Sequence, residues 1–300
     1  MLPLFSVLLG LNLLGCEPAI DVHNSDDVTA DATKTDASPQ PEGIASQRIV
    51  TVPGNITETV FALGMGDRVV GACASSMHPA AVESIPKVGY RSNLNAEGVL
   101  SLSPDLVIAT DEAGPEDVME QIRAAGVRIE MVPSERTLEG AIDRTTRIAK
   151  LLNASEAGDG LVSAIRSGIA SVPTASTDER EKPRVMFIYV ARKTSMVAGT
   201  GTAAEAMIAL AGGINAVTAF EAFKPINPES IVKANPDFIL LDDSGLKAIG
   251  GIDGVLALPG VSQTVAGTKR QIIVMDKTLL LGFGPRLAEG AVELARMLQR

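Results

Sequence analysis

Residues 95–110 read NAEGVLSLSPDLVIAT, and residues 228–242 read PESIVKANPDFILLD. In both stretches a short helical segment carries a glutamate in its first turn, runs into Pro-Asp and continues as an apolar strand. The glutamate precedes the proline by seven residues in each. Apolar residues could match by chance in one element. A matched glutamate, Pro-Asp pair and strand are better explained by two homologous lobes.

Around both stretches, short apolar runs typical of strands alternate with segments of helical periodicity. Strands are expected at RIVTVP (48–53), DRVVGA (67–72), LVIAT (106–110), VRIEMVP (127–133), RVMFIYV (184–190) and FILLD (238–242). Helices are expected at 55–66, 95–103, 115–126 and 202–213, and PESIVKANPD (228–237) repeats the helical NAEGVLSLSPD (95–105) before its strand. This alternation predicts the α/β class, with a parallel sheet in each of two similar Rossmann-like lobes.

The segment 137–172 lies between the two repeats, and its apolar residues recur at roughly helical spacing. It predicts one long helix, or two helices end to end, that joins the lobes, with Gly158 and Gly160 as weak points. We therefore expect an N-terminal lobe at 47–136 and a C-terminal lobe at 183–300, with a ligand cleft between them.

The N-terminal residues indicate export rather than a folded element. Residues 1–16, MLPLFSVLLGLNLLGC, are apolar and end in a stretch that resembles the bacterial lipobox, which predicts a signal peptide and lipidation of Cys16. Residues 17–46 carry seven acidic residues and one lysine, with almost no large apolar side chains. Such a segment cannot bury enough surface to offset its ordering entropy, so we expect a disordered acidic tether.

Composition and motifs exclude several classes of function. The formal net charge of −10 argues against nucleic acid, whose phosphates need a basic surface. Outside the tether His78 is the only histidine, which leaves no histidine-paired nucleophile and no Cys/His zinc cluster. Asp111-Glu112 and Asp242-Asp243 follow equivalent strands and are interpreted as loop or helix-cap residues. The sequence favours a binding protein whose site is the cleft between lobes.

From about Arg48 onward the chain resembles the haem-binding proteins of bacterial haem ABC importers. These belong to the helix-bridged, class III substrate-binding proteins, which also serve cobalamin and siderophores. The resemblance rests on four stretches: IVTVPGNITETVFALGMGDRVVG (49–71), VGYRSNLNAEGVLSLSPDLV (88–107), GVLALPGVSQTVAG (254–267) and LLLGFGPR (279–286).

The resemblance implies that Tyr90 is an axial ligand to the iron of ferric haem. Ferric iron and a nearby cation both favour the phenolate, which is a good hard ligand. Arg91 could stabilise the phenolate or pair with a haem propionate. The family commonly has its arginine two places after the tyrosine, and this chain has it one place after. Adjacent residues of an extended segment point oppositely, so a surface arginine is the alternative reading.

Further haem contacts are implied at the cleft rim. Arg192, Lys193 and Lys224 are candidate propionate partners from the second lobe, and a solvated lysine is the alternative for Lys224. The loop around His78 lies near the cleft mouth in this class. His78 is therefore either a rim contact, a second iron ligand, or an ordinary loop histidine.

The matched glutamates are Glu97 and Glu229. In this class one carboxylate on each lobe docks into arginine pockets of the two permease subunits, and these two residues hold the matching positions. Each glutamate also suits a helix N-terminus on its own.

Taken with the resemblance, the sequence predicts a monomeric, exported lipoprotein, periplasmic or at the cell surface. It would capture haem as a transported ligand, without catalysis, and deliver it to an ABC permease dimer with its ATPase subunits. A cobalamin-binding or ferric-siderophore-binding protein on the same scaffold is the first alternative. A porphyrin-processing enzyme or haem chaperone is the alternative of another class.

Overall fold

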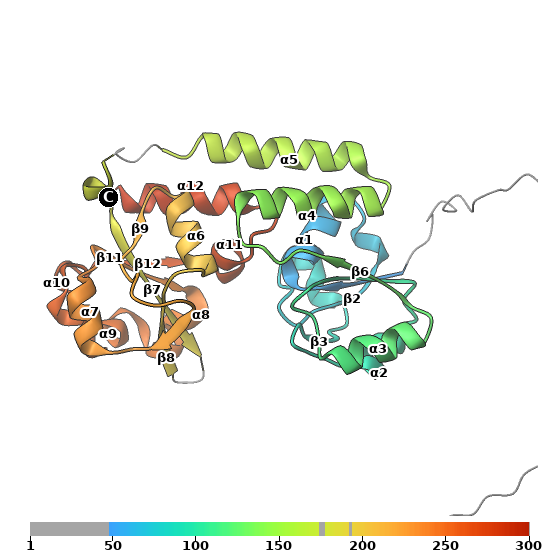
Figure 1. The fold of residues 1–300 in the computed structure, drawn as a ribbon, viewed down its shortest axis with the longest axis horizontal. Helices are drawn as coiled ribbons and strands as arrows, with labels where there is room; N and C mark the ends of the chain where they lie inside the picture. Colours follow the sequence, from blue (N-terminus) through green and yellow to red (C-terminus); the bar gives the residue numbers. More distant parts are fainter. Residues whose placement is uncertain (1–47, 174–177, 192–193, 300) are drawn as a thin grey trace, which may run out of the picture. The chain divides into compact units, whose positions relative to one another are not determined.

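The computed structural model describes residues 48–173, 178–191 and 194–299 (Figure 1). The described residues belong to one compact unit. The signal peptide, Cys16 and the acidic tether predicted for residues 1–46 lie outside the described residues, as do Arg192 and Lys193. In the part of the chain that is described, no helix has both the length and the apolar character needed to cross a membrane.

The N-terminal lobe is built on a four-stranded parallel sheet in the order β2-β1-β5-β6. Its strands are β1 (Ile49–Val52), β2 (Val69–Ala72), β5 (Leu106–Thr110) and β6 (Arg128–Val132). The main helices are α1 (Gly54–Ala62), α2 (Ala96–Leu100) and α3 (Glu116–Ala124), with short turns η1 (Gly66–Arg68) and η2 (Ala80–Ser84). One face of the sheet packs on α1 and the other on α2 and α3, which explains why β1 and β5 are buried throughout.

The C-terminal lobe has a six-stranded mixed sheet in the order β10-β8-β7-β11-β12, with β9 also paired to β7. The strands are β7 (Arg184–Ala191), β8 (Thr194–Ala198), β9 (Ile214–Asn215), β10 (Phe223–Pro225), β11 (Phe238–Asp242) and β12 (Ile272–Met275). Strands β8 and β10 run antiparallel to their neighbours, so the sheet is not wholly parallel as the sequence predicted.

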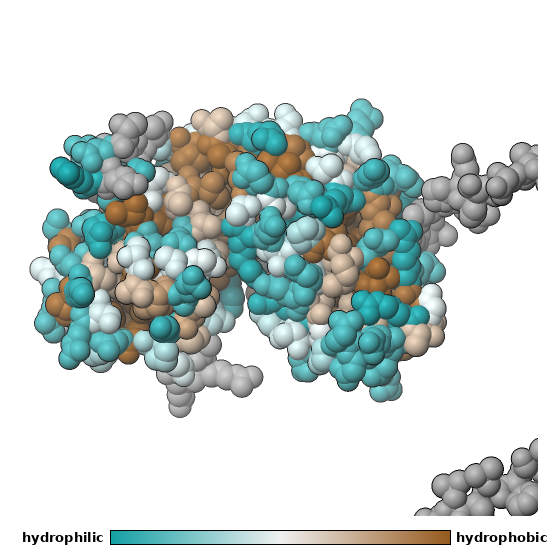
Figure 2. Space-filling model, viewed as in Figure 1, coloured by the Kyte–Doolittle hydropathy of each residue, from teal (hydrophilic) through white to brown (hydrophobic). Residues whose placement is uncertain are grey.

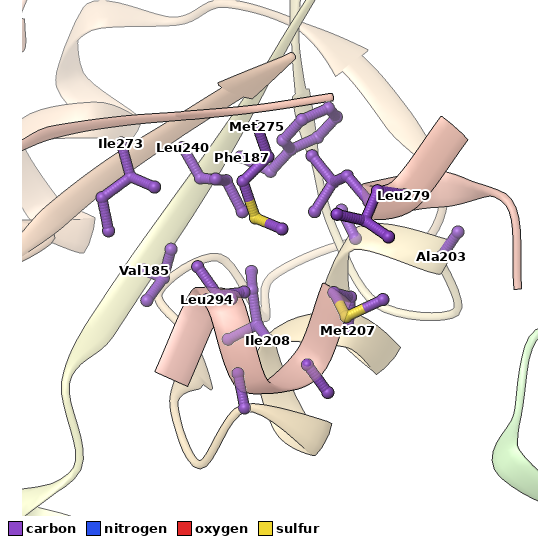
Figure 3. Packing of buried hydrophobic residues seen from close by; sticks show 14 of the residues in the cluster. Val185, Phe187, Ala203, Met207, Ile208, Leu240, Ile273, Met275, Leu279 and Leu294 are labelled. Carbon is purple, nitrogen blue, oxygen red and sulfur yellow. The ribbon is translucent and has the colours of Figure 1, made fainter. Parts of the chain in front are cut away.

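Helices cover both faces of this second sheet. Figure 3 shows the larger core, where Val185, Phe187 and Leu240 of the sheet meet α6 (Ala203–Leu210), α11 (Lys277–Leu281) and α12 (Leu287–Leu298). The other face packs on α7 (Pro228–Ala234), α8 (Asp243–Ile249), α9 (Gly251–Leu256), η4 (Val261–Gln263) and α10 (Val265–Lys269). The short turn η3 (Glu179–Glu181) precedes β7. Aliphatic residues dominate both cores, as the low aromatic content requires.

The internal repeat extends to individual hydrogen bonds at the helix starts. The Oδ1 of Asn95 accepts from the backbone N–H of Gly98 at 3.1 Å, and the Oδ1 of Asn227 accepts from that of Ser230, also at 3.1 Å. Asparagine is a favoured residue at this position because its side chain satisfies a free helix N–H. The two glutamate-bearing helices, α2 and α7, therefore begin in the same way.

The Pro-Asp pairs also serve the same purpose in the two lobes. The Oδ2 of Asp105 accepts from the backbone N–H of Arg48 at 2.8 Å, and the Oδ2 of Asp237 accepts from that of Arg184 at 2.9 Å. Each aspartate thereby fixes the start of its central strand against the neighbouring strand. The residue before each proline is left-handed, with φ of 46° at Ser103, so the chain turns sharply from helix to strand.

Two helices link the lobes: α4 (Leu138–Leu151) and α5 (Ser155–Ala170). They pack side by side, whereas the sequence predicted one long helix or two end to end (Figure 1). Asn153, with φ of 56°, lies in the three-residue turn between them and allows the reversal. Helix α4 packs on α1, and α5 packs on α12, so the pair spans both lobes. Figure 2 shows apolar side chains gathered over α5 and α12 on this face.

Candidate ligand-binding site

Tyr90 lies on a small hairpin formed by β3 (Gly89–Tyr90) and β4 (Asn93–Leu94). Tyr90 is 45% exposed, whereas a tyrosine in a folded lobe usually has most of its ring surface buried. Gly89 has φ of +105°, and a Cβ there would lie 2.6 Å from the Asn93 carbonyl oxygen. Only glycine fits this close crossing, which brings Tyr90 out of the lobe surface.

Arg91 occupies the two-residue turn between β3 and β4 rather than an extended segment. The alternation of side chains along a strand therefore does not apply to it. Its guanidinium carbon lies 4.9 Å from the centre of the Tyr90 ring, and its Nη1 donates a short hydrogen bond to the Tyr90 hydroxyl oxygen. The objection raised by its spacing from the tyrosine is thus removed: the turn folds the arginine back onto its neighbour.

A carboxylate and a second arginine complete this group. The Nε of Arg91 lies 2.9 Å from Oε2 of Glu112, which also accepts from Nη2 of Arg136 at 2.8 Å. The other carboxylate oxygen accepts from the same Arg136 nitrogen at 2.6 Å. Glu112 lies in a turn after β5, in agreement with its interpretation as a loop or helix-cap residue, but neither these contacts nor a role for Arg136 was predicted from the sequence.

Arg144 of α4 lies behind this group, and its side chain is fully buried. Its Nη1 donates to the carbonyl oxygens of Pro133 and Glu135, and its Nη2 donates to that of Phe283 at 2.5 Å. Burial lowers the pKa of Arg144 to about 10, with a further contribution from the charge of Arg136. The guanidinium still carries its charge at neutral pH and ties α4 to the loop before α12.

A hollow of about 230 Å³ lies where residues of α1 and the His78 loop meet Pro285 and Arg286. Glu58 faces it and pairs with Arg286, Oε1 to Nη2 at 2.9 Å. Burial raises the pKa of Glu58, because the hydrogen bond and charge of Arg286 only partly offset the loss of water. Burial alone lowers the pKa of Arg286, but Glu58 outweighs it and the net direction is upward.

The remaining predicted residues belong to other elements than the Tyr90 hairpin. His78 is exposed and lines the hollow beside Glu58. Lys224 is exposed on β10, and its Nζ lies 5.0 Å from the centre of the Phe220 ring in its own lobe. Tyr189, the second tyrosine of the chain, is partly buried on β7 and packs against the larger core of the C-terminal lobe. Phe223, which the sequence analysis overlooked, is 38% exposed beside Lys224.

Glu97 and Glu229 are both exposed, each in the first turn of its helix after the asparagine cap. Their carboxylates therefore remain available to solvent in equivalent places of the two lobes.

Comparison with known families gives one match over most of the chain. The profile of the periplasmic binding protein family matches residues 49–279. Among curated proteins, the chain is similar to the uncharacterized ABC transporter substrate-binding lipoprotein YvrC of Bacillus subtilis. The two are 30% identical over 269 residues, which cover 88% of this chain and 84% of the relative. The cobalamin-binding protein of Halobacterium salinarum is 25% identical, over 83% of this chain and 68% of its own length.

Among solved structures, the chain is similar to the periplasmic heme-binding protein RhuT from Roseiflexus sp. RS-1 in apo form. The sequences are 39% identical, the TM-score is 0.79, and the match covers 84% of this chain and 98% of the other. The fold of this chain is accordingly the two-lobe, class III fold of haem-binding proteins.

Proposed function

Because the chain belongs to the periplasmic binding protein family, we propose that it is the substrate-binding component of an ABC importer and that its ligand is ferric haem. The observation that carries the choice of ligand is the exposed Tyr90, whose hydroxyl oxygen accepts a hydrogen bond from Arg91. The similarity to a haem-binding protein of known structure supports the same choice.

The mechanism is capture and delivery. Tyr90 binds the iron as a phenolate, because a hard anionic oxygen suits Fe(III). The hydrogen bond from Arg91 stabilises the negative charge on that oxygen. Phe223 offers apolar surface to the porphyrin from the other lobe, and the exposed cation of Lys224 beside it can meet a propionate. Arg192 and Lys193, in the same lobe, and His78, at the rim, remain further candidates.

Titration of the purified apoprotein with hemin tests the proposal. We expect one charge-transfer band, typical of ferric haem bound by a phenolate, and its loss in Tyr90→Phe, with affinity lowered by at least about tenfold. The chain contains two tyrosines, so Tyr189→Phe is the matched control and should keep the band. Equal spectra of the wild type and Tyr90→Phe would reject Tyr90 as the iron ligand.

Cobalamin is the second candidate, because a curated relative is named as a cobalamin-binding protein. Against it, aromatic residues make up only 3% of this chain, and large corrin faces are usually covered by aromatic side chains. Competition between cobalamin and hemin on one sample separates the two, and a ferric siderophore belongs in the same series. The tighter ligand by calorimetry is the substrate.

Chemical turnover of the haem would indicate a porphyrin-processing enzyme instead. Incubation of the haem complex with a reductant, followed by analysis of the pigment, distinguishes these functions. Recovery of unaltered haem in a stoichiometric amount supports transport, whereas a modified porphyrin would contradict it.

We also propose that the protein is an exported monomer, anchored to the membrane through lipidated Cys16. In this proposal Glu97 and Glu229 dock onto the two permease subunits, with the ATPase subunits on the far side of the membrane. Their exposure and their matched places in the repeat support this role.

A further inference from the structure

The Tyr90 hydroxyl accepts a hydrogen bond from Arg91, and the Arg91 side chain is in turn fixed by an ion pair with Glu112. Arg91 uses two different nitrogens: Nη1 for the Tyr90 hydroxyl oxygen and Nε for Glu112, at 2.9 Å from Oε2. A guanidinium is planar and presents its N–H groups in fixed directions. Once Nε is paired with Glu112, the plane of the group and the direction of Nη1 follow.

Glu112 belongs to the loop after β5, and the same loop holds the backbone of the Tyr90 hairpin. The N–H of Gly114 donates to the carbonyl oxygen of Arg91 at 2.8 Å, and the carbonyl oxygen of Gly114 accepts from the N–H of Leu94 at 2.9 Å. The loop thus fixes both the main chain and the side chain of Arg91. A turn residue would otherwise have several rotamers open to it, since its side chain is about a third exposed.

We propose that Glu112 is a positioning residue of this site: with Arg136, it aims Arg91 at the phenolic oxygen of Tyr90 and so sets the strength of iron binding. The consequence for haem rests on the function proposed above, whereas the effect on the Tyr90 hydroxyl can be measured without any ligand.

Arg136 makes the net charge of the group Arg91, Glu112 and Arg136 positive. A lone carboxylate beside Arg91 would cancel the positive charge that favours an anionic oxygen. Arg136 contacts both oxygens of Glu112, at 2.6 and 2.8 Å, and so balances that carboxylate. Two arginines and one glutamate give these three side chains a net charge of +1, and Arg91 is the member that contacts the Tyr90 hydroxyl. Partial burial, with all three side chains 30–38% exposed, keeps water from screening that charge completely.

The first test measures the hydroxyl without haem. Tyrosine labelled with ¹³C at the ring carbon that bears oxygen gives two NMR signals, because the chain has two tyrosines, and Tyr189→Phe assigns them. Glu112→Gln should shift the Tyr90 signal and leave that of Tyr189 in place. The matched control is Glu116→Gln, which breaks the exposed pair of Glu116 with Arg123 on α3 and should shift neither signal.

The second test measures hemin affinity and the charge-transfer band of the same variants. Glu112→Gln should bind hemin about tenfold more weakly and move the band, while Glu116→Gln matches the wild type. An unmoved Tyr90 signal, or hemin binding as tight as in the control, overturns the proposal. Tighter binding also overturns it, because Glu112 would then be a competitor of the haem carboxylates.

The two proposals fail separately. If Tyr90→Phe binds hemin with the wild-type spectrum, the proposed iron ligand is wrong, even where Glu112→Gln shifts the Tyr90 signal. If Tyr90→Phe loses the band but Glu112→Gln behaves as Glu116→Gln does, the ligand stands and the positioning residue is wrong.

Discussion

Arg144 is the largest of the fully buried side chains that the structure describes, and it is a cation. Its guanidinium serves three carbonyl oxygens, including that of Phe283, whose φ of 52° is unusual for a bulky residue. The strained loop at Phe283 and the segment before α4 are therefore held by one charged group. This group has no carboxylate partner among the contacts described and depends on carbonyl dipoles.

We expect Arg144→Met to destabilise the protein by about 3 kcal/mol, because the carbonyl oxygens would stay buried without donors. The matched control is Arg147→Met, on the same helix, where an exposed ion pair with Asp143 is lost. Exposed pairs of this spacing contribute about 0.5 kcal/mol or less. Urea unfolding of both variants provides the comparison, and equal midpoints would show that Arg144 has no such role.

At this scale the sequence predicts some residues and not others, for physical reasons. The caps Asn95 and Asn227 accept from N–H groups three residues further along the chain, so contacts of this kind lie within reach of a sequence pattern. The contact between Glu112 and Arg136 joins residues 24 apart, and it exists only because the ends of β5 and β6 meet at one edge of the sheet. A local sequence pattern does not indicate which residues at the strand ends come into contact.

At the scale of elements, the contact between α4 and α5 depends on a glycine. A Cβ at Gly158 would lie 2.3 Å from the Cβ of Ala149, far inside van der Waals contact. At Gly160, two residues later on the same helix, a Cβ would meet nothing within 4 Å. Both glycines are predicted from the sequence to be weak points of the helix. The structure shows that Gly158 permits the close approach and that only Gly160 lacks a packing role.

Two alanine substitutions should therefore change the stability of the protein in opposite directions. Gly160→Ala is expected to stabilise the protein by about 0.5–1 kcal/mol, since alanine is the better helix former and the space is open. Gly158→Ala should destabilise it by about 1–3 kcal/mol, because the helices must separate or shift. Thermal unfolding by calorimetry measures both. A gain in stability from Gly158→Ala would contradict the packing argument.

The predicted strands include those with continuous burial, and β10, at the edge of the second sheet, was missed. Strands β1, β5 and β11 are buried throughout, so their apolar runs identify them. Strand β10 is exposed at all three positions and ends in Pro225, which lacks the N–H of a central strand. Its pairing with β8 comes from position in the lobe rather than from composition.

At the scale of the whole molecule, the two exposed glutamates offer a test of docking. Reversing both charges, Glu97→Lys with Glu229→Lys, should lower haem uptake by cells about tenfold or more, because like charges would meet at the permease. Hemin affinity should stay unchanged. The control variant is Glu120→Lys with Glu293→Lys. These two glutamates are also exposed, one in each lobe, and their substitution changes the net charge by the same amount.

Uptake is measured with labelled haem in cells whose only copy of the protein is the variant. Equal uptake by the two charge-reversed proteins would mean that Glu97 and Glu229 only support the starts of α2 and α7. A loss of hemin affinity in the first variant would place these residues near the ligand instead.

The pair of Glu58 and Arg286 links α1 to the segment before α12, and it makes the stability of the molecule depend on pH. Glu58 is 8% exposed, and burial raises its pKa above the ordinary 4.5. The folded protein therefore holds this proton more tightly than the unfolded chain does. The stabilisation from the proton is complete below pH 4.5 and is lost as the pH rises through the folded pKa.

Glu58→Gln removes the titration while keeping a hydrogen-bond acceptor for Arg286. The free energy of unfolding of the wild type, minus that of Glu58→Gln, should fall as the pH is raised from about 4 to about 7 in urea titrations. Arg286→Met leaves the buried carboxylate unpaired, so its loss of about 3 kcal/mol at neutral pH should shrink in acid, where Glu58 takes up a proton. A difference between wild type and Glu58→Gln that rises with pH would mean that Arg286 outweighs burial and that the pKa of Glu58 is lowered.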